Sequence, residues 1–474
     1  MARVEALSPQ WVEPKEEDGA KRYPVVICGA GLSGLTIAFA LKRRGVPALV
    51  IDRSEAGAEG PWGVARMETL RSPKHLSGLD LGVPSLTARS WHEAVHGADA
   101  WESLVRISRT DWIDYLNWFR KVAGIAVQNR TRLVSVEPVE GGLALTLEGP
   151  DGPRRTALCR RLVLATGIDG CGGPYVPDPV KALPKSAWAH SGDPIDLGAL
   201  AERDVAILGS GTSSFDWAVA ALEARARSVT MFGRSADFPR TEVLAWTNFP
   251  GLLGAFGELP DLDRWRFARL YFQFKVPPTQ DQYDRARSRP NFAMRLGCRI
   301  SGFSMEGEKL RLATEDGGAL VDRLLLGTGY ELDFARRPEL ANLAGAVSFW
   351  RDRFQPPSGE EEPFLASHPY LGPGFELTPR RTSVDDWVSC VHLFNPGALV
   401  SLGPISNGVT GLKYGAPRIA AALVKALFTE DAPRYLAALA AYSEAHFDPR
   451  TDDARFTDPE DQHGAHGRNS SLRT

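Results

Sequence analysis

Two stretches of the chain show the same order of apolar and small residues. In the first, the apolar run Val25–Ile27 leads into a glycine-rich turn, an apolar helical pattern and a second apolar run that ends at Ile51. In the second, Val205–Leu208 leads into another glycine-rich turn, and an apolar run follows over 229–232. Short apolar runs bounded by glycine are typical of buried strands, so each stretch predicts a strand–turn–helix–strand unit.

Two further apolar runs resemble each other. Residues 161–165 lead into Thr166 and Gly167, and residues 324–326 lead into a Gly-Thr-Gly-Tyr sequence that ends at Tyr330. Both predict buried strands that end in a turn of small residues. Small residues at such a turn allow the backbone to come close to a cofactor.

This order predicts that the second unit is inserted into the first. We expect an α/β protein with two Rossmann-like dinucleotide-binding domains: residues 1–170 and 331–474 form one domain, and residues 171–330 form the other. The polar tail from about residue 449 is predicted to be disordered. The stretch 241–289, rich in Trp, Phe and Arg, is predicted to be helical, and it either covers the active site or packs between domains.

The first glycine-rich turn has the spacing of a dinucleotide-binding loop. Gly29 allows the tight turn, Gly31 lets backbone amides approach a pyrophosphate, and Gly34 lets the helix pack against the strand. The pyrophosphate would rest at the positive end of the helix. Asp52 follows the second strand, where a carboxylate accepts hydrogen bonds from a ribose diol.

The second turn repeats the loop with a different residue at the strand end. Gly209 and Gly211 occupy the loop, but Phe232 stands where an acidic residue would bind a ribose, and Arg234 follows it. An arginine there can pair with a 2′-phosphate, which predicts NADPH. Two nucleotides on one chain are the arrangement of a flavin enzyme supplied by a pyridine nucleotide, so FAD and NADPH are the expected cofactors.

Composition narrows the function class. A net charge of −3 and 43% hydrophobic residues provide no basic surface for nucleic acid or membrane, and no apolar run has the length of a membrane span. Residues 1–21 are polar and lack the apolar core of a secretion signal. The five cysteines form no Cys-x-x-Cys pair and no metal-ligand spacing, which argues against a flavin disulfide reductase and predicts a cytoplasmic protein without a metal.

These motifs resemble the class B flavin-dependent monooxygenases, the superfamily of flavin-containing, Baeyer–Villiger and N-hydroxylating monooxygenases. The resemblance covers nearly the whole chain. It is carried by the two loops, by Gly60-Pro61-Trp62-Gly63, by Ala165-Thr166-Gly167, by Arg234-Ser235, by Gly327-Thr328-Gly329-Tyr330 and by the stretch 406–414. It implies cofactor-binding roles for residues in these motifs: Gly29, Gly31, Gly34, Asp52, Arg53, Trp62, Thr166, Gly209, Gly211, Thr212, Ser213, Ser214, Arg234, Ser235, Thr328, Tyr330, Gly408, Gly411 and Leu412.

The resemblance implies an NADPH- and O2-dependent monooxygenase that inserts one oxygen atom through a peroxyflavin. N-hydroxylation of a small amine or amino acid is the expected reaction. A Baeyer–Villiger or sulfide monooxygenase and a non-oxygenating NADPH-dependent flavoprotein are the alternatives. The Baeyer–Villiger fingerprint ends in a tryptophan where this chain has Pro194, which counts against that branch. The expected partners are a small-molecule substrate and O2, without nucleic acid or stable membrane association. Whether the chain forms a homo-oligomer is left open by the sequence.

Three residues are catalytic candidates by the same resemblance. Lys74 and His75 lie in the basic segment after the Gly-Pro-Trp motif, which should pass the flavin ring. They either hydrogen-bond the flavin, the nicotinamide ribose or the peroxide, or belong to a solvated basic loop. Asn407 lies in the C-terminal stretch where family members return a helix N-terminus to the flavin. Ser108 predicts a helix start, and no chemistry is assigned to the helix that follows.

Overall fold

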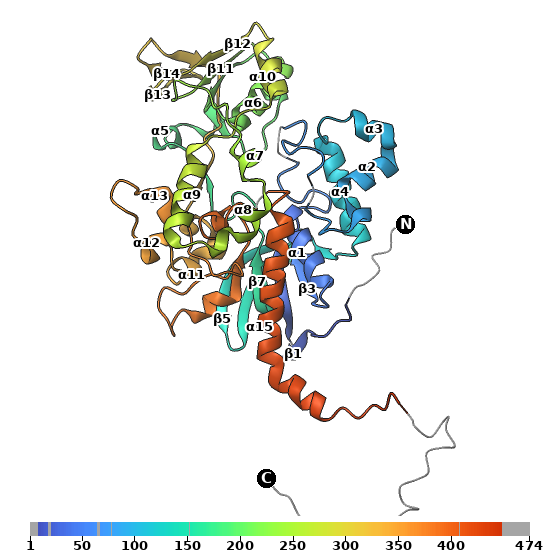
Figure 1. Ribbon diagram of the computed structural model, residues 1–474. Helices are drawn as coiled ribbons and strands as arrows, with labels where there is room; N and C mark the ends of the chain where they lie inside the picture. The colour runs from blue at the N-terminus through green and yellow to red at the C-terminus, as the bar shows by residue number, and fades with distance from the viewer. Residues whose placement is uncertain are drawn as a thin grey trace, which may run out of the picture. The chain divides into compact units, whose positions relative to one another are not determined.

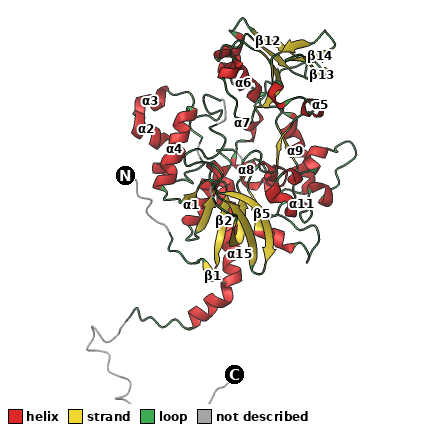
Figure 2. Cartoon of the chain, turned by 180° about the vertical axis from the view of Figure 1, so that it is seen from behind, coloured by secondary structure: helices red, strands yellow, loops and turns green. Residues whose placement is uncertain are grey.

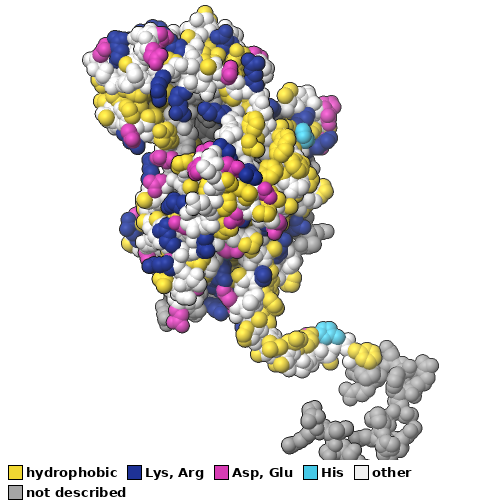
Figure 3. Space-filling model, turned by 60° about the vertical axis from the view of Figure 1, so that its left-hand side comes forward, with side chains coloured by type: hydrophobic (Ala, Val, Ile, Leu, Met, Phe, Trp, Pro, Cys, Tyr) yellow, Lys and Arg dark blue, Asp and Glu magenta, His cyan; other side chains and the backbone are white. Residues whose placement is uncertain are grey.

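The computed structural model describes residues 8–17, 20–63, 67–76, 78–150, 152–406 and 408–447. Residues up to Leu427 form one compact unit, and those from Phe428 form a second, smaller one. The predicted disordered tail lies outside the described residues. The described part of the second unit exposes Phe428, Leu436, Leu439, Tyr442 and Phe447, and Figure 3 shows hydrophobic side chains along this segment.

The first sheet is built around β2, whose central residues Val25 and Ile27 are fully buried. The order of its strands is β4-β3-β2-β7-β6-β5, with β1 antiparallel to β2 and β18 parallel to β7. A parallel core covered on both faces explains why these strands are continuous apolar runs. Its strands are β1 (Lys15–Glu17), β2 (Ala20–Cys28), β3 (Ala48–Ile51), β4 (Val127–Gln128), β5 (Arg132–Val139), β6 (Gly142–Glu148), β7 (Arg155–Leu164) and β18 (Val391–Leu393).

The strand register places three loops at one edge of this sheet. Cys28, the last residue of β2, pairs with Ile51 of β3 and with Leu164 of β7. The residues that follow these three strand ends therefore lie together, as expected for the carboxyl edge of a parallel sheet. Helix α1 (Leu32–Lys42) connects β2 to β3.

The second sheet is parallel throughout the described residues, in the order β12-β11-β10-β16-β9. Leu208 pairs with Phe232 and with Leu326, so the strand ends align again, and α6 (Thr212–Glu223) connects β10 to β11. Figures 1 and 2 both show β12 grouped with α6, apart from β5. Its strands are β9 (Trp188–His190), β10 (Asp204–Leu208), β11 (Ser228–Phe232), β12 (Phe292–Arg295) and β16 (Arg323–Leu326).

The chain passes between the two sheets through a short antiparallel ribbon. β8 (Gly172–Pro174) pairs with β17 (Tyr330–Leu332), next to the positions where the sequence predicts the domain boundaries. The boundaries themselves stay a prediction, because both sheets belong to one compact unit. A further antiparallel sheet contains β13 (Ile300–Glu306), β14 (Lys309–Thr314) and β15 (Ala319–Val321).

The stretch 241–289 is helical, as predicted, and contains α7 (Val243–Thr247), α8 (Pro250–Ala255), α9 (Asp261–Gln273) and α10 (Gln280–Arg287). On α9, the buried Trp265 packs against Trp350 with ring centroids 6.0 Å apart, and Arg264 donates to the carbonyl of Ser401 at 3.0 Å. These contacts give α9 a packing role. The remaining helices are α2 (Ala88–His96), α3 (Ala98–Ser103), α4 (Arg109–Val122), α5 (Asp178–Lys181), α11 (Ala341–Ala344), α12 (Trp350–Arg353), α13 (Pro363–Ala366), α14 (Leu399–Leu402) and α15 (Leu412–Ala440).

Two fully buried histidines make the fold sensitive to acid. His368 and His392 each donate one ring N–H to a backbone carbonyl, of Phe364 and of Gly374. In both rings the other nitrogen, Nε2, is buried without a hydrogen-bond partner among the described residues. Burial lowers the pKa of each histidine to about 4, because a protonated ring would leave a charged N–H unpaired.

We expect the free energy of unfolding to fall as the pH decreases from about 6.5 towards 4. In the unfolded state the two histidines have their ordinary pKa, about 6.5, so they take up protons before the folded ones do. The free energy of unfolding therefore falls by about 2 kcal/mol per histidine between pH 6.5 and 5. His392→Asn keeps a donor for Gly374 and removes the titration. Denaturant unfolding of the purified protein at the two pH values should show a smaller pH dependence for this variant than for wild type. His446→Asn, an exposed control, should behave as wild type, and equal slopes for all three proteins would contradict the assignment.

Candidate functional site

The first glycine-rich turn is fixed by the packing of the chain itself. Gly29 has a φ of +104°, and a Cβ there would lie 2.3 Å from the carbonyl oxygen of Ala165. A Cβ at Gly34 would lie 1.8 Å from the carbonyl oxygen of Gly29. Both positions therefore exclude a side chain. Gly31 caps α1 without a side-chain hydrogen bond, which leaves backbone N–H groups at this helix start for a ligand.

Asp52 lies directly after β3 and faces the loop. Its side chain is buried, and its two oxygens accept from the backbone N–H of Ala30 at 2.7 Å and of Ser54 at 2.8 Å. A carboxylate has about four acceptor sites, so each oxygen keeps capacity for a ribose hydroxyl. The neighbouring Arg53 is exposed and lies 3.5 Å from Asp169.

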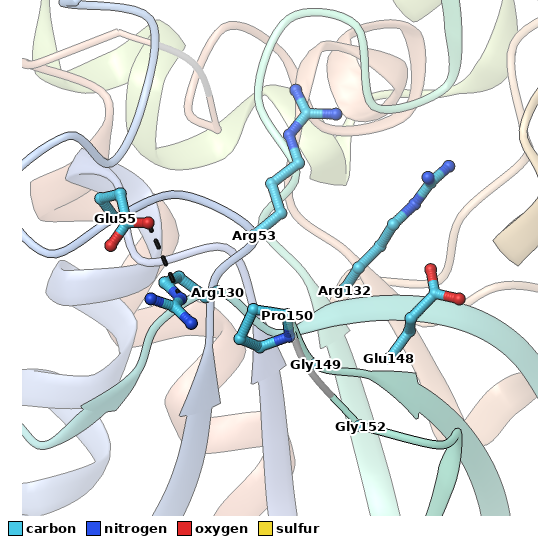
Figure 4. A pocket seen from close by; sticks show the side chains of 8 residues that line it. All are labelled: Arg53, Glu55, Arg130, Arg132, Glu148, Gly149, Pro150 and Gly152. Atoms are coloured by element: carbon cyan, nitrogen blue, oxygen red, sulfur yellow. Dashed lines mark ion pairs between the residues drawn. The ribbon is translucent and has the colours of Figure 1, made fainter.

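A surface hollow of about 690 Å³ lies beyond the end of β3. Figure 4 shows Arg53, Arg130 and Arg132 around it, with Glu55 3.7 Å from Arg130. Its lining includes Arg53, the residue after Asp52, but not Asp52 itself. It does not include the glycine-rich turn.

Trp62 forms one wall beside the first turn. A narrow pocket there is lined by Gly31, Trp62 and Asn117, among others. The Trp62 ring packs edge-to-face on Trp112 at 6.1 Å, and its indole nitrogen is buried without a hydrogen-bond partner in the described part of the chain. A buried donor of this kind normally has a partner, so Trp62 Nε1 fits a site that a cofactor completes.

The C-terminal turn also reaches the first loop. Ser33 on α1 donates to the carbonyl of Ser406 at 3.2 Å, and a Cβ at Gly411 would lie 2.4 Å from the carbonyl oxygen of Pro404. Leu412 is fully buried where α15 begins. Gly408 has open space at its Cβ position, and Asn407 lies outside the described residues. The structure therefore brings the predicted C-terminal stretch to the start of α1.

Of the basic segment after Trp62, residues 65–76, the structure describes residues 67–76. Gly78, just after this segment, is close to the C-terminal turn, because a Cβ there would lie 1.9 Å from the carbonyl oxygen of Val409. Lys74 donates to the carbonyls of Trp101 and of Glu102, the latter at 3.1 Å, and thus points to α3. His75 is exposed. The catalytic roles of Lys74 and His75 stay predictions.

Thr166 and Thr328 occupy equivalent places after their strands. Thr166 accepts a hydrogen bond from the buried Asn395 at 3.1 Å, and Thr328 donates to the carbonyl of Tyr175. Next to Thr328, the Tyr330 ring lies edge-on to His190 with centroids 5.4 Å apart. These contacts place both residues at the crossings between the sheets.

His190 has a defined neutral tautomer. Its Nδ1 accepts from the Gly192 N–H at 3.0 Å, so its Nε2 donates to the carbonyl of Gly329 at 2.9 Å. Burial lowers its pKa. Both ring nitrogens are engaged with backbone, so the residue positions the chain crossing and has no free nitrogen to move a proton.

The second glycine-rich turn is only partly fixed by the chain. A Cβ at Gly209, where φ is +122°, would lie 2.6 Å from the carbonyl oxygen of Gly327. At Gly211 a Cβ would meet nothing within 4 Å, so the described chain leaves space there. The hydroxyls of Thr212 and Ser214 are buried at the start of α6 without a partner among the described residues, and Ser213 is half-buried between them. Open space and unpaired donors at a helix start fit a pyrophosphate.

Arg234 is exposed after β11, and no described residue bonds it. The intervening Gly233 packs close to the loop, since a Cβ there would lie 3.0 Å from the Cβ of Ser210. Ser235 accepts a backbone hydrogen bond from Gly297 at 2.9 Å, which holds the start of the loop. Arg234 is therefore a free guanidinium beside the second turn, as a 2′-phosphate would require.

A polar contact that no sequence motif indicates joins the basic segment to the helices of the second sheet. Arg71 forms an ion pair with Asp216 on α6, and Gln282 on α10 donates to the same carboxylate. Arg285 on α10 pairs with Glu68. Burial raises the pKa of Asp216, and the Arg71 charge opposes that shift. These residues join the segment after Trp62 to α6 and α10.

In the described part of the chain, no helix combines the length and apolar character needed to cross a membrane.

Comparisons with known proteins match this arrangement. Residues 101–248 match the family model described as L-lysine 6-monooxygenase/L-ornithine 5-monooxygenase, and residues 26–169 match the FAD-NAD(P)-binding model. An FAD-dependent urate hydroxylase from Xanthomonas campestris pv. campestris is 40% identical over 444 residues, which cover 92% of this chain and 93% of the hydroxylase.

Solved structures share the fold at lower identity. Ornithine hydroxylase from Pseudomonas aeruginosa has a TM-score of 0.66 and 18% identity, covering 86% of this chain and 100% of that chain. Ornithine N-hydroxylase from Kutzneria sp. 744, solved with reduced FAD, NADP⁺ and L-ornithine, has a TM-score of 0.64 and 16% identity, covering 85% and 99%. The predicted α/β fold with two Rossmann-like sheets is confirmed.

Gly29→Ala and Gly211→Ala should impair the binding of different cofactors. The first forces a side chain into the Ala165 carbonyl at a positive φ, so purified protein should lose its flavin absorbance by about tenfold or more, for a cost above about 1.4 kcal/mol. In Gly211→Ala the new Cβ meets no atom of the chain, so the protein should keep its flavin. The same Cβ takes up space needed by the NADPH pyrophosphate, so the affinity for NADPH should fall. Circular dichroism checks that each variant folds. A flavin-loaded Gly29→Ala protein, or flavin loss in Gly211→Ala, would refute the assignment of the two loops.

Arg234→Ala should weaken NADPH by about 1.5–3 kcal/mol, roughly 10- to 150-fold in Kd, since one charge-assisted contact to the 2′-phosphate is lost. NADH, which lacks that phosphate, should bind as before. Arg287→Ala removes another exposed arginine of the same sheet region and serves as the matched control. Titration of each variant with both nucleotides provides the measurement, and an equal loss for NADPH and NADH would contradict the role of Arg234.

Proposed function

The chain belongs to the class B flavin-dependent monooxygenases, with FAD and NADPH as its cofactors, and we propose that it hydroxylates urate or a closely related oxidised purine. The observation that carries the substrate is the 40% identity to a urate hydroxylase over nearly the full length of both chains. The ornithine hydroxylases, at 18% identity or less, support the fold and not the substrate.

FAD fits the first loop. The N–H groups at the start of α1 would hold the FAD pyrophosphate, and Asp52 would accept a hydrogen bond from a ribose hydroxyl. Trp62 Nε1, which has no partner in the described chain, would donate a hydrogen bond to FAD. The turn that contains Gly408 and Gly411 lies close enough to close this end of the site. When bound, the flavin supplies the activation of O2, for which NADPH supplies the electrons.

NADPH fits the second loop. The space at Gly211 would admit the pyrophosphate, the hydroxyl of Thr212 would bond to it, and Arg234 would pair with the 2′-phosphate. The Arg71–Asp216 pair would hold the start of this nucleotide site against the flavin-side segment. The chain's own task is then to orient the two nucleotides and to exclude water from the space between them.

The basic segment suits a urate-type substrate. Urate is a planar monoanion at neutral pH, and it presents several N–H donors and carbonyl acceptors. In the described part of this segment, Arg71 is engaged with Asp216 and Lys74 with backbone carbonyls, whereas the exposed His75 has no bond to a described residue. His75 is therefore the side chain that we assign to substrate contact.

N-hydroxylation of a small amine or amino acid, the reaction expected from the sequence, is the second candidate. The match of residues 101–248 to the lysine and ornithine monooxygenase model favours it. A primary amine and a purine differ in shape and charge, so one substrate panel separates the two reactions.

The cellular location and the assembly are also proposals. All five cysteines are free thiols in the structure, which supports the cytoplasm as the location. The homo-oligomer stays a prediction that sedimentation of the FAD-loaded protein tests directly.

The test is oxygen transfer by the FAD-loaded protein. NADPH oxidation is followed with urate, xanthine, L-ornithine, L-lysine, a cyclic ketone and a thioether, and isotopically labelled O2 is traced into the product by mass spectrometry. We expect urate to stimulate NADPH oxidation most and to acquire one labelled atom. A labelled hydroxylamine from L-ornithine or L-lysine, with no labelled purine, would replace the proposal by the second candidate. Hydrogen peroxide alone with every substrate would contradict both.

A further inference from the structure

Two histidines on α2 face one carboxylate on α4, outside the nucleotide sites. His92 and His96 are one helical turn apart, so their side chains share a face of α2. Asp111 lies in the first turn of α4. Figures 1 and 2 show α2 and α4 side by side. One ligand atom from each of the three residues lies within 4.8 Å of the other two.

The spacing suits a small transition-metal ion. His96 Nε2 and Asp111 Oδ1 are 3.5 Å apart, and the two imidazole centroids are 4.6 Å apart. Zinc bonds of about 2.0–2.1 Å in a tetrahedral site place neighbouring donor atoms about 3.3–3.4 Å from one another. The His96–Asp111 separation already matches that edge, and a rotation of the His92 ring would complete the triangle.

His92 is a buried ring with an unpartnered nitrogen. Its side chain is 4% exposed, and its Nδ1 is buried without a hydrogen-bond partner among the described residues. Its neighbours are the aromatic rings of Trp101 at 5.4 Å and of His96. An ordinary ion pair between His96 and Asp111 would account for those two residues but not for a buried imidazole with an unpaired nitrogen.

We propose that His92, His96 and Asp111 form a binding site for a divalent transition-metal ion, with Zn²⁺ as the metal that fits best. Two neutral nitrogens and one carboxylate favour zinc over calcium or magnesium, which take oxygen ligands. A water molecule would fill the fourth position. Beside this cluster, the Lys74 ammonium is held by the backbone carbonyls of Trp101 and Glu102.

The metal would stabilise the wall of the flavin site. At the start of α4, Arg109 donates to the carbonyl of Trp62 at 2.9 Å, and Trp112 packs on the Trp62 ring. A metal that joins α2 to the first turn of α4 therefore holds the residues that position Trp62. The inference does not depend on the identity of the substrate, and its failure would leave the urate proposal unchanged.

The test uses the FAD-loaded protein after treatment with a chelator, titrated with Zn²⁺ alone by calorimetry and monitored by thermal unfolding. We expect one Zn²⁺ per chain at this site and a Tm that rises with free Zn²⁺, because the ion binds the folded state. His96→Gln and Asp111→Asn should each lower the affinity by about 100-fold or more, exceeding the 10- to 100-fold effect typical of residues behind the metal ligands.

Two controls separate this site from zinc bound elsewhere. His446→Gln removes an exposed histidine in the second compact unit and should retain the affinity and the Tm increase of wild type. Co²⁺ in place of Zn²⁺ should produce a visible absorption band that His96→Gln abolishes. The proposal is overturned if Zn²⁺ binds His96→Gln as tightly as wild type, or if Zn²⁺ leaves the wild-type Tm unchanged.

Discussion

The structure depends on one kind of close contact between two backbone segments, and this contact occurs in both sheets. In each sheet, the first glycine of the loop lies against the carbonyl oxygen at the end of the adjacent parallel strand: Gly29 against Ala165, and Gly209 against Gly327. A side chain at either glycine would separate the loop from that strand end. Because the strand ends are aligned by register, this contact fixes where each helix starts and where its unpaired N–H groups point.

The two halves are then joined by chain crossings, by polar contacts and by the packing of α9 against Trp350. The β8–β17 ribbon carries the chain in both directions, and the His190–Gly329 hydrogen bond fastens one crossing. The ion pair between Arg71 and Asp216 links the flavin-side segment to α6, one turn after the second loop. These polar contacts help to orient the two nucleotide sites, and those that are partly or fully buried are weakly screened by solvent.

The sequence predicts those parts of the site that lie within one short stretch of chain. It does not predict contacts between residues far apart in the sequence. The loops, Asp52 and Arg234 belong to strand–turn–helix–strand units, whose spacing is set within some thirty residues. Glu68–Arg285, Arg71–Asp216 and His96–Asp111 each join different elements, and no periodicity relates their positions. Lys74 shows the same limit, because its bonds to the carbonyls of α3 follow from tertiary packing.

The two loops differ in how completely the chain encloses them, and this bears on how the cofactors behave. Around the first, Trp62 forms a wall, Ser33 is bonded to Ser406, and Gly34 is locked by packing. Around the second, Gly211 faces open space and Arg234 is exposed. A ligand enclosed by several chain segments can leave only when those segments move, whereas one bound at an open helix start can exchange freely. We infer that FAD is the resident cofactor and that NADPH binds and leaves during turnover.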